Sequence, residues 1–305
     1  MSRNIFVVGS INMDLVISCD RLPMLGESKK GHSFFQNQGG KGANQAIACK
    51  KLGHDNVHFI GAIGNDENGK ALIQTMKTYG INIDGTQRID GVNSGVCMIA
   101  LDESKKDNIL IIDGGTNKYL DKDLVNDYLL KHAKEGDILI TQLEVNLDAV
   151  YEANKLAKSL GMYTILNPAP ICEFNKDIYN YLDLVVLNET EAKLLTNIEC
   201  ETIQDAKSIY EKLNVNEIII TLGGKGGYYA SKNEVIPAPV YKVDVVDTTC
   251  AGDTYIGAIA LRISKGISIK DSLSFAARCS SITVSRKGAG ISIPTKEEIE
   301  QFERS

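Results

Sequence analysis

The distribution of hydrophobic positions divides most of the chain into alternating short and long elements. Short β-branched runs predict strands, and longer segments with apolar residues every three or four positions predict helices. Strands are expected at residues 5–8, 57–62, 138–141, 163–167, 184–187 and 217–222. Helices are expected at residues 43–52, 69–79, 120–132, 147–160, 203–213, 252–265, 269–284 and from 295. This alternation predicts an α/β fold, a three-layer domain in which helices flank a mainly parallel central sheet.

Two segments interrupt the alternation, because each pairs strand-like runs without a helix between them. Their strands are expected at residues 13–18, 32–36, 96–101 and 108–112. They could form a small β-sheet lid over the main sheet, or they could be edge hairpins of that sheet. The lid interpretation assigns residues 14–36 and 95–113 to the lid, and residues 1–13, 37–94 and 114–305 to the α/β domain.

Composition and charge narrow the class of partner. The 305 residues are 43% hydrophobic and carry a net charge of −6, with Lys and Arg spread along the chain. This argues against nucleic-acid and anionic-membrane surfaces, and no apolar run approaches membrane-spanning length. Seven cysteines stand singly, and the first expected strand follows too closely for a signal peptide. We therefore expect a cytoplasmic protein without a structural metal, whose partners are small molecules.

The segment 246–254, VDTTCAGDT, places small residues and a carboxylate at the start of a long apolar helix. The unpaired backbone N–H groups of a helix start attract negative charge. Ala251 and Gly252 would leave these donors open to a phosphate. Asp253 would repel one, and suits a base that takes a proton from a substrate hydroxyl. An ordinary Asp that complements the helix dipole explains the segment equally well.

Two glycine-rich segments also adjoin expected elements. GGKGANQ at 39–45 opens a helix and is either a structural turn or a loop in which Lys41 and Asn44 contact a sugar or phosphate. TLGGKGG at 221–227 follows a strand, where ligands of open α/β sheets gather. Neither the Walker A spacing nor GxGxxG occurs, so the usual P-loop and Rossmann signals are missing.

Polar residues near the ends of two strands leave further alternatives. Asn188 and Glu191 fit a plain capping box, or Glu191 points toward whatever binds at the strand ends. Asn12 and Asp14 would face the same way on an extended chain, where they suit vicinal sugar hydroxyls, and a turn explains them almost as well.

Together these segments resemble the ribokinase branch of the PfkB family of carbohydrate kinases, along almost the whole chain. The matching motifs are GGKGANQ at 39–45, QLE at 142–144, NPAP at 167–170, NETEA at 188–192, TLGGKG at 221–226 and DTTCAGDTY at 247–255. The resemblance implies transfer of the γ-phosphoryl group of Mg-ATP to the 5-hydroxyl of D-ribose. It also implies Asp253 as general base, and an anion hole at the backbone of Cys250, Ala251 and Gly252.

The resemblance implies the other site residues as well. The α/β domain would bind nucleotide and substrate, with ribose held by Asn12, Asp14, Gly40, Lys41, Asn44, Glu144 and Asp253. Asn188, Thr221, Gly223 and Gly226 match nucleotide-site positions, and Glu191 matches a glutamate linked to Mg²⁺ and phosphate. A monovalent cation, K⁺, would be bound mostly through backbone oxygens of Asp247, Thr249, Thr283, Arg286, Gly288 and Ser292. Family members usually form homodimers through the lid strands, whose edges are open.

Two positions depart from the family pattern. Cys250 stands where Gly or Ala is usual, and a thiol beside the phosphate could make the protein sensitive to oxidation or alkylation. Tyr255 stands where Phe is common, which keeps the ring and adds a hydroxyl. Because the anion hole uses N–H groups, the chemistry should survive both changes.

Two other functions compete with ribose phosphorylation. The first is a sister kinase that acts on 2-deoxyribose, another sugar or a nucleoside, although Asn12, Asp14 and Lys41 favour ribose. The second, from another class, is a catalytically silent sugar- or nucleotide-binding sensor. The intact Asp253 and the small residues beside it argue against the sensor.

Overall fold

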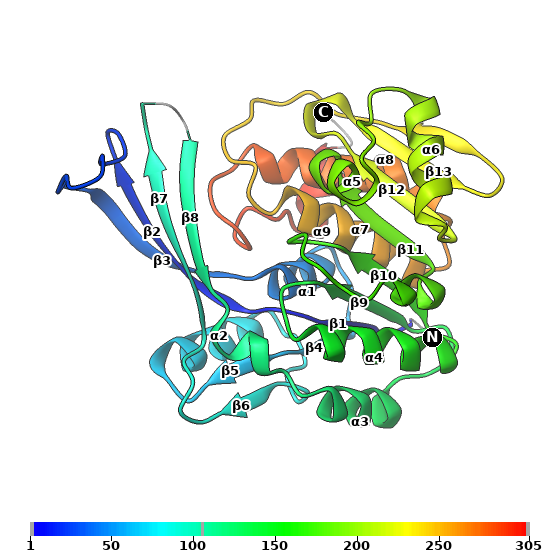
Figure 1. Cartoon of the computed structure of the whole chain (residues 1–305), viewed down its shortest axis with the longest axis horizontal. Helices are drawn as coiled ribbons and strands as arrows, with labels where there is room; N and C mark the ends of the chain where they lie inside the picture. Colours follow the sequence, from blue (N-terminus) through cyan, green and yellow to red (C-terminus); the bar gives the residue numbers. More distant parts are fainter. Residues whose placement is uncertain (1–2, 105–106, 303–305) are drawn as a thin grey trace.

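The central sheet is the main feature of the computed structural model, which describes residues 3–104 and 107–302 (Figure 1). Residues 1–2, 105–106 and 303–305 of the expected domain ranges lie outside the described residues. In spatial order the sheet contains β14 (Val235–Ala238), β13 (Gly227–Ser231), β12 (Glu217–Thr221), β11 (Leu184–Asn188), β10 (Tyr163–Asn167), β9 (Ile138–Gln142), β1 (Ile5–Val8) and β4 (Val57–Ile60). The strands from β12 to β4 are parallel, and β13 and β14 add an antiparallel edge. The expected mainly parallel sheet is confirmed.

Helices cover both faces of this sheet. Strand β1 is buried throughout, and its alternate residues enter different cores: Ile5 and Val7 pack in one, Phe6 and Val8 in the other. The first core includes α1 (Lys41–Lys51), α2 (Glu67–Thr78), α7 (Ala251–Ser264), α8 (Ile269–Val284) and α9 (Lys296–Phe302). The second includes α3 (Lys122–His132), α4 (Leu147–Ser159), α5 (Glu189–Thr196) and α6 (Ile203–Leu213). Because parallel strands are buried on both faces, their sequences read as continuous apolar runs.

Smaller elements complete the main domain. A parallel pair, β5 (Ala62–Gly64) and β6 (Gln87–Ile89), lies near α2, and short 3-10 helices are η1 (Gly115–Tyr119), η2 (Lys176–Tyr181) and η3 (Gly223–Lys225). Among the described residues, no helix has both the length and the apolar character needed to cross a membrane.

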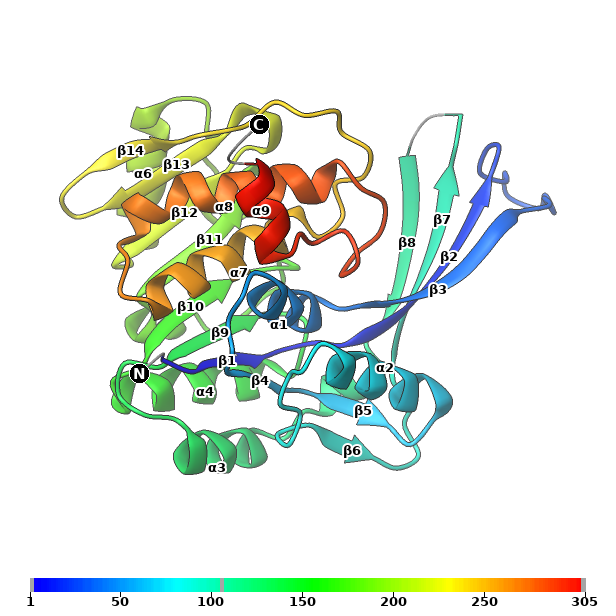
Figure 2. The same cartoon turned by 180° about the vertical axis from the view of Figure 1, so that it is seen from behind.

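The remaining four strands form a sheet of their own, so the edge-hairpin alternative is wrong. Its order is β3 (His32–Gly39), β2 (Asn12–Cys19), β7 (Gly95–Asp102) and β8 (Asp107–Asp113), with β2 and β7 parallel. Figures 1 and 2 show this lid sheet projecting beside the carboxyl ends of the main parallel strands. Strand β2 begins at Asn12 and β3 ends at Gly39, so the sheet reaches further into the main domain than expected.

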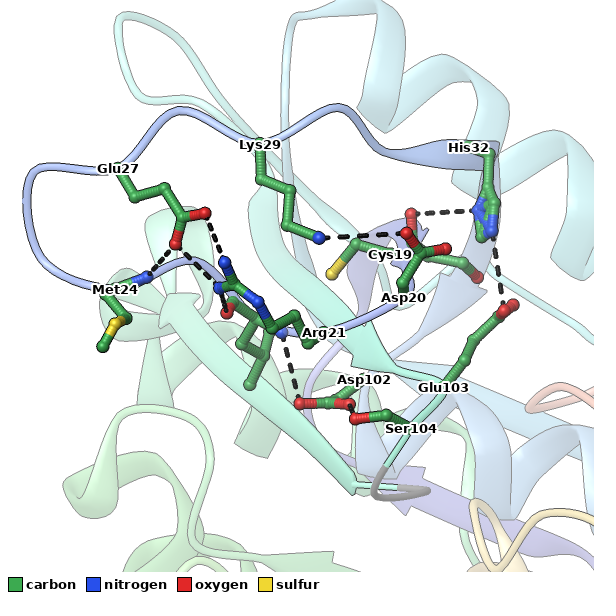
Figure 3. A network of polar contacts seen from close by, with 12 residues as sticks. Cys19, Asp20, Arg21, Met24, Glu27, Lys29, His32, Asp102, Glu103 and Ser104 are labelled. Carbon is green, nitrogen blue, oxygen red and sulfur yellow. Dashed lines mark hydrogen bonds and ion pairs between the residues drawn. The ribbon is translucent and has the colours of Figure 1, made fainter.

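Polar contacts join the two turns at the far end of the lid sheet (Figure 3). Arg21 pairs with Glu27 within the turn after β2, at 2.6 Å. Asp102, at the end of β7, accepts the backbone N–H of Leu22 at 3.2 Å. The hydrogen bond to Asp102 ties the turn after β2 to the end of β7. The ion pair is open to solvent, and such exposed pairs typically contribute under about 1 kcal/mol each.

Candidate active site

The start of α7 presents an open helix end at the carboxyl edge of the main sheet. The preceding residue, Cys250, has a left-handed backbone with φ of 67°, and no side chain caps the first turn. A Cβ atom added at Gly252 would meet no atom within 4 Å. The first turn therefore has room for an anion to approach its backbone donors, as the sequence predicts.

Asp253 is buried beside this turn and is held by side chains of α1. Its Oδ1 accepts a hydrogen bond from Gln45 Nε2 at 3.0 Å, and its Oδ2 accepts one from Asn44 Nδ2 at 3.2 Å. The carboxylate thus contacts another helix and does not cap its own. This arrangement argues against the plain dipole-complementing alternative and fits a positioned base.

The thiol of Cys250 lies 3.7 Å from Asp253 Oδ2 and donates toward it. Burial raises the pKa of this thiol well above its ordinary value, and the charge of Asp253 raises it further. Reactive cysteines are thiolates in exposed, electropositive surroundings. The geometry therefore argues against the sensitivity to alkylation expected from the sequence.

The glycines of the 39–42 turn allow close backbone packing. A Cβ at Gly40, where φ is 90°, would lie 2.7 Å from Ile11 Cα, and one at Gly42 would lie 2.6 Å from the carbonyl carbon of Gly9. A Cβ at Gly39 would lie 2.2 Å from Asp14 Oδ2. These positions are glycine because a side chain would collide with the backbone of residues 9–11 or with Asp14. The same packing places Lys41 and Asn44 where they interact with Asp253.

Asn12 and Asp14 lie on strand β2 and are both buried, so the turn alternative for them is wrong. Asn12 Oδ1 accepts a hydrogen bond from Asn117 Nδ2 at 2.8 Å. Burial, and to a smaller extent the charge of Glu144, raises the pKa of Asp14 to about 7. The carboxyl of Asp14 is therefore close to half protonated near neutral pH.

Carboxylates surround the ammonium group of Lys41. Burial alone lowers its pKa, but the charges of Asp253, Glu144 and Glu191 outweigh that effect, and the net result is a raised pKa. Glu144 also accepts the backbone N–H of Lys41 at 3.2 Å and the hydroxyl of Ser10. The charge of Lys41 thus interacts with carboxylates after β9 and in the first turn of α5, as well as with the base candidate.

The proposed nucleotide residues line the ends of β11 and β12. Asn188 and Glu191 form a reciprocal capping box, each side chain accepting the other's backbone N–H at 2.8 Å. The capping interpretation is confirmed, and the carboxylate of Glu191 also interacts with the charges of Lys41 and Asp253 while burial raises its pKa. Thr221 lies opposite Asn188 in the strand register. Gly223 and Gly226 have φ of 53° and 89° and form the turn that follows.

The expected cation ligands lie in the loop before α7, in the last turn of α8 and in the loop that follows α8. Asp247 accepts the N–H of Thr249 at 2.9 Å and that of Gly288 at 3.0 Å, and this bond joins the loops. Thr283, which is buried like Ser292, donates to Thr254 Oγ1 at 3.0 Å. The guanidinium of Arg286 pairs with Glu298 at 2.9 Å, so only its backbone oxygen could face a cation. The side-chain oxygens of Asp247 are already engaged, which fits a ligand set of mainly backbone oxygens.

Three buried amides received no role from the sequence: one contacts Asp253, and the other two contact the first. They are Gln45, Gln142 and Asn167, at the start of α1 and at the ends of β9 and β10. Their positions in the sequence could have indicated a role in the site, since all three lie within the matched motifs GGKGANQ, QLE and NPAP.

Comparison with known proteins agrees with this geometry. A model of the pfkB family carbohydrate kinases matches residues 2–296. The chain belongs to the PfkB family. A ribokinase from Schizosaccharomyces pombe is 38% identical, over 97% of this chain and 96% of that protein. A deoxyribokinase from Salmonella typhi is 31% identical, over 98% of each chain.

The PfkB fold is also found among solved structures. An Arabidopsis thaliana ribokinase complexed with ribose and ATP superposes with a TM-score of 0.87 at 29% identity, covering 100% of both chains. The fold assignment of this PfkB kinase, a mainly parallel sheet with a separate small sheet, is therefore confirmed by its own topology and by its structural relative.

Proposed function

We propose that this PfkB kinase transfers the γ-phosphoryl group of ATP to O5 of D-ribose, giving ribose 5-phosphate and ADP. The observation that carries the proposal is the buried Asp253 carboxylate, which two side chains of α1 hold beside the open end of α7. Ribokinases that align over nearly the whole chain support ribose as the acceptor.

In the reaction, Asp253 takes the proton of the 5-hydroxyl while O5 attacks the γ-phosphorus. The O5–phosphorus bond forms, the bond to the β,γ-bridging oxygen breaks, and ADP leaves. The backbone N–H groups of Cys250, Ala251 and Gly252 stabilise the charge on the transferred group. Asn12, Asp14, Gly40, Lys41, Asn44 and Glu144 hold the sugar, and Asn188, Thr221, Gly223 and Gly226 hold the nucleotide.

Two cations belong to the proposal. A divalent ion bound with ATP would neutralise phosphate charge, and Glu191, whose carboxylate interacts with Lys41 and Asp253, would be linked to it. A monovalent ion, K⁺, would be held by Asp247, Thr249, Thr283, Arg286, Gly288 and Ser292, mostly through backbone oxygens. Both ligand sets fit hard cations, which prefer oxygen.

We also propose a cytoplasmic homodimer. The lid strands expose large apolar side chains, among them Phe34 at 61%, Met98 at 58% and Ile111 at 65%. Exposed apolar groups of this size on strands with open edges favour pairing with a second copy. All seven cysteines lie within the described residues and no disulfide joins them, which fits a reducing compartment. Light scattering of the purified protein should give twice the chain mass of 33.2 kDa.

The test of the function is ADP release from Mg-ATP with D-ribose, 2-deoxyribose, fructose, adenosine and pseudouridine, each with and without K⁺. We expect turnover with ribose, raised by K⁺. Preferred turnover with another acceptor would keep the phosphotransfer mechanism and replace the substrate. Binding of ribose or ATP without turnover would overturn the proposal in favour of the silent sensor.

The affinity for ribose should depend on pH through Asp14. Because the pKa of its carboxyl is raised to about 7, the group is mostly protonated below that pH and charged above it. A charged carboxylate accepts hydrogen bonds about twice as strongly as a neutral acceptor. KM for ribose should therefore fall as pH rises from about 6 to about 8, by several-fold, and Asp14→Asn should remove this slope. A wild-type KM that is flat over this interval would contradict the assignment.

A further inference from the structure

A chain of buried amides connects Asp253 to the ends of two central strands. Gln45 Nε2 donates to Asp253 Oδ1 at 3.0 Å and to Asn167 Oδ1 at 3.3 Å. Gln45 Oε1 accepts from Gln142 Nε2 at 2.7 Å. Gln142 and Asn167 are register partners at the ends of β9 and β10, and Asn167 Nδ2 donates to the carbonyl of Val186 at 3.1 Å. Gln45 thus has both polar atoms satisfied by groups fixed on the sheet.

The donors and acceptors in this series of hydrogen bonds follow from the charge of Asp253. An ionised carboxylate only accepts hydrogen bonds, so the atom of Gln45 that faces Asp253 must be its nitrogen. Its oxygen then faces Gln142, which must donate. A flipped Gln45 would set its carbonyl oxygen against Asp253 Oδ1, at a cost that the burial of both groups makes large. The remaining amide atom, Gln142 Oε1, is buried against Gly9 and has no hydrogen-bond partner among the described residues.

The two carboxylate oxygens of Asp253 are consequently not equivalent. Oδ1 is held by Gln45, a fully buried side chain on the sheet side. Oδ2 faces Asn44, a proposed sugar contact, and Cys250, the first residue of the proposed anion hole. We infer that Gln45 is a positioning residue that anchors Oδ1 and so presents Oδ2 to the attacking hydroxyl, and that Gln142 holds Gln45 in the orientation this requires. The inference rests on the proposed phosphotransfer.

The test compares Gln45→Met, Gln142→Met and Gln45→Glu with wild type in the ADP-release assay. Gln45→Met keeps the side-chain length and removes the donor. We expect kcat to fall on the order of 10- to 100-fold, with KM for ribose and ATP within about threefold of wild type, because Gln45 holds the base and is not a proposed ligand of either substrate. Gln142→Met should give a smaller fall of the same kind, about two- to tenfold.

Gln45→Glu supplies a readout that a structural role would not move. A second carboxylate beside Asp253 would retain a shared proton, so the acid limb of the kcat profile should shift to higher pH. Asn154→Leu is the matched control, because Asn154 is an equally buried amide in α4, on the other face of the sheet. Its Nδ2 donates to Thr141 Oγ1 and to the carbonyl of Val150. It should lower stability without changing kcat or the pH profile of the folded enzyme.

The outcomes separate this inference from the proposed function. Wild type without turnover on any acceptor would overturn the proposed function and, with it, this inference. An active wild type whose Gln45 variants keep its kcat and pH profile would overturn the positioning role alone. A Gln45 variant whose KM rises while its kcat falls would also contradict the positioning role, because general damage to the folded site produces both changes. If Gln45→Met does not fold, the pH profile of kcat for the near-isosteric Gln45→Glu variant tests the positioning role.

Discussion

Asp253→Asn is expected to lower kcat for ribose phosphorylation by about 10² to 10⁴, the usual range for loss of a general base. The amide has nearly the same shape as the carboxylate and can still accept from Gln45 or Asn44, whose hydrogen bonds now end on Asp253. The buried site should therefore remain folded. KM for ribose should change much less than kcat, because the lost interaction acts mainly in the transition state.

The control for this variant is Asp127→Asn, an exposed aspartate on α3, on the opposite face of the sheet. It makes the same chemical change without touching the site, and its kinetics should match wild type. Thermal unfolding of both variants shows whether the fold is kept. A kcat for Asp253→Asn within tenfold of wild type would reject the base and return Asp253 to the dipole-complementing role.

Gly252→Ala is expected to abolish most activity while leaving stability unchanged or slightly higher. In the helix, Ala is favoured over Gly by up to about 1 kcal/mol, and the added Cβ meets no atom within 4 Å. The space that it fills is the approach to the backbone donors of the first turn of α7. We expect kcat/KM for ATP to fall on the order of 10²-fold, by comparison with losses of single anion-hole donors.

Gly42→Ala is the matched comparison, because it makes the same substitution at a glycine that has no room for a Cβ atom. Its Cβ would lie 2.6 Å from the backbone of Gly9, so α1 must move away from β1. Overpacking of this kind typically costs about 1–3 kcal/mol, which urea unfolding would measure as a lower midpoint. If Gly252→Ala proved as unstable as Gly42→Ala, or fully active, the open helix end would not be the phosphate site.

The sequence anticipated the larger architecture because burial acts on local patterns. Strand β1 is apolar at every position because helices cover both faces of the sheet, and the missing helices within residues 14–36 and 95–113 correctly indicated paired strands. The ends of the lid strands were less accurate. Asn12 and the polar segment NQG at 37–39 did not look like strand, yet Asn12 pairs with Gly39 in β2 and β3, where the hydrogen-bond ladder overrides local preference.

The candidate site shows a similar division. The small residues before Asp253 predict an open helix end, since that property belongs to one short segment. The partners of Asp253 could not be predicted from the residues themselves, because Gln45 lies 208 positions away and Gln142 comes from a third segment. Their amides look like ordinary polar residues until the sheet brings its strand ends together.

By itself, the sequence determined the α/β class, the presence of paired strands within residues 14–36 and 95–113 and the motifs that place the chain among the PfkB kinases, because these follow from periodicity and from residues close together in the chain. Whether those strands form a sheet of their own was decided by the tertiary structure. Tertiary structure alone decided which groups surround Asp253, why the pKa of Asp14 is raised to about 7 and why the pKa of the Cys250 thiol is raised. Those properties arise from burial and from charges on distant segments, and both exist only once the strands and helices are packed.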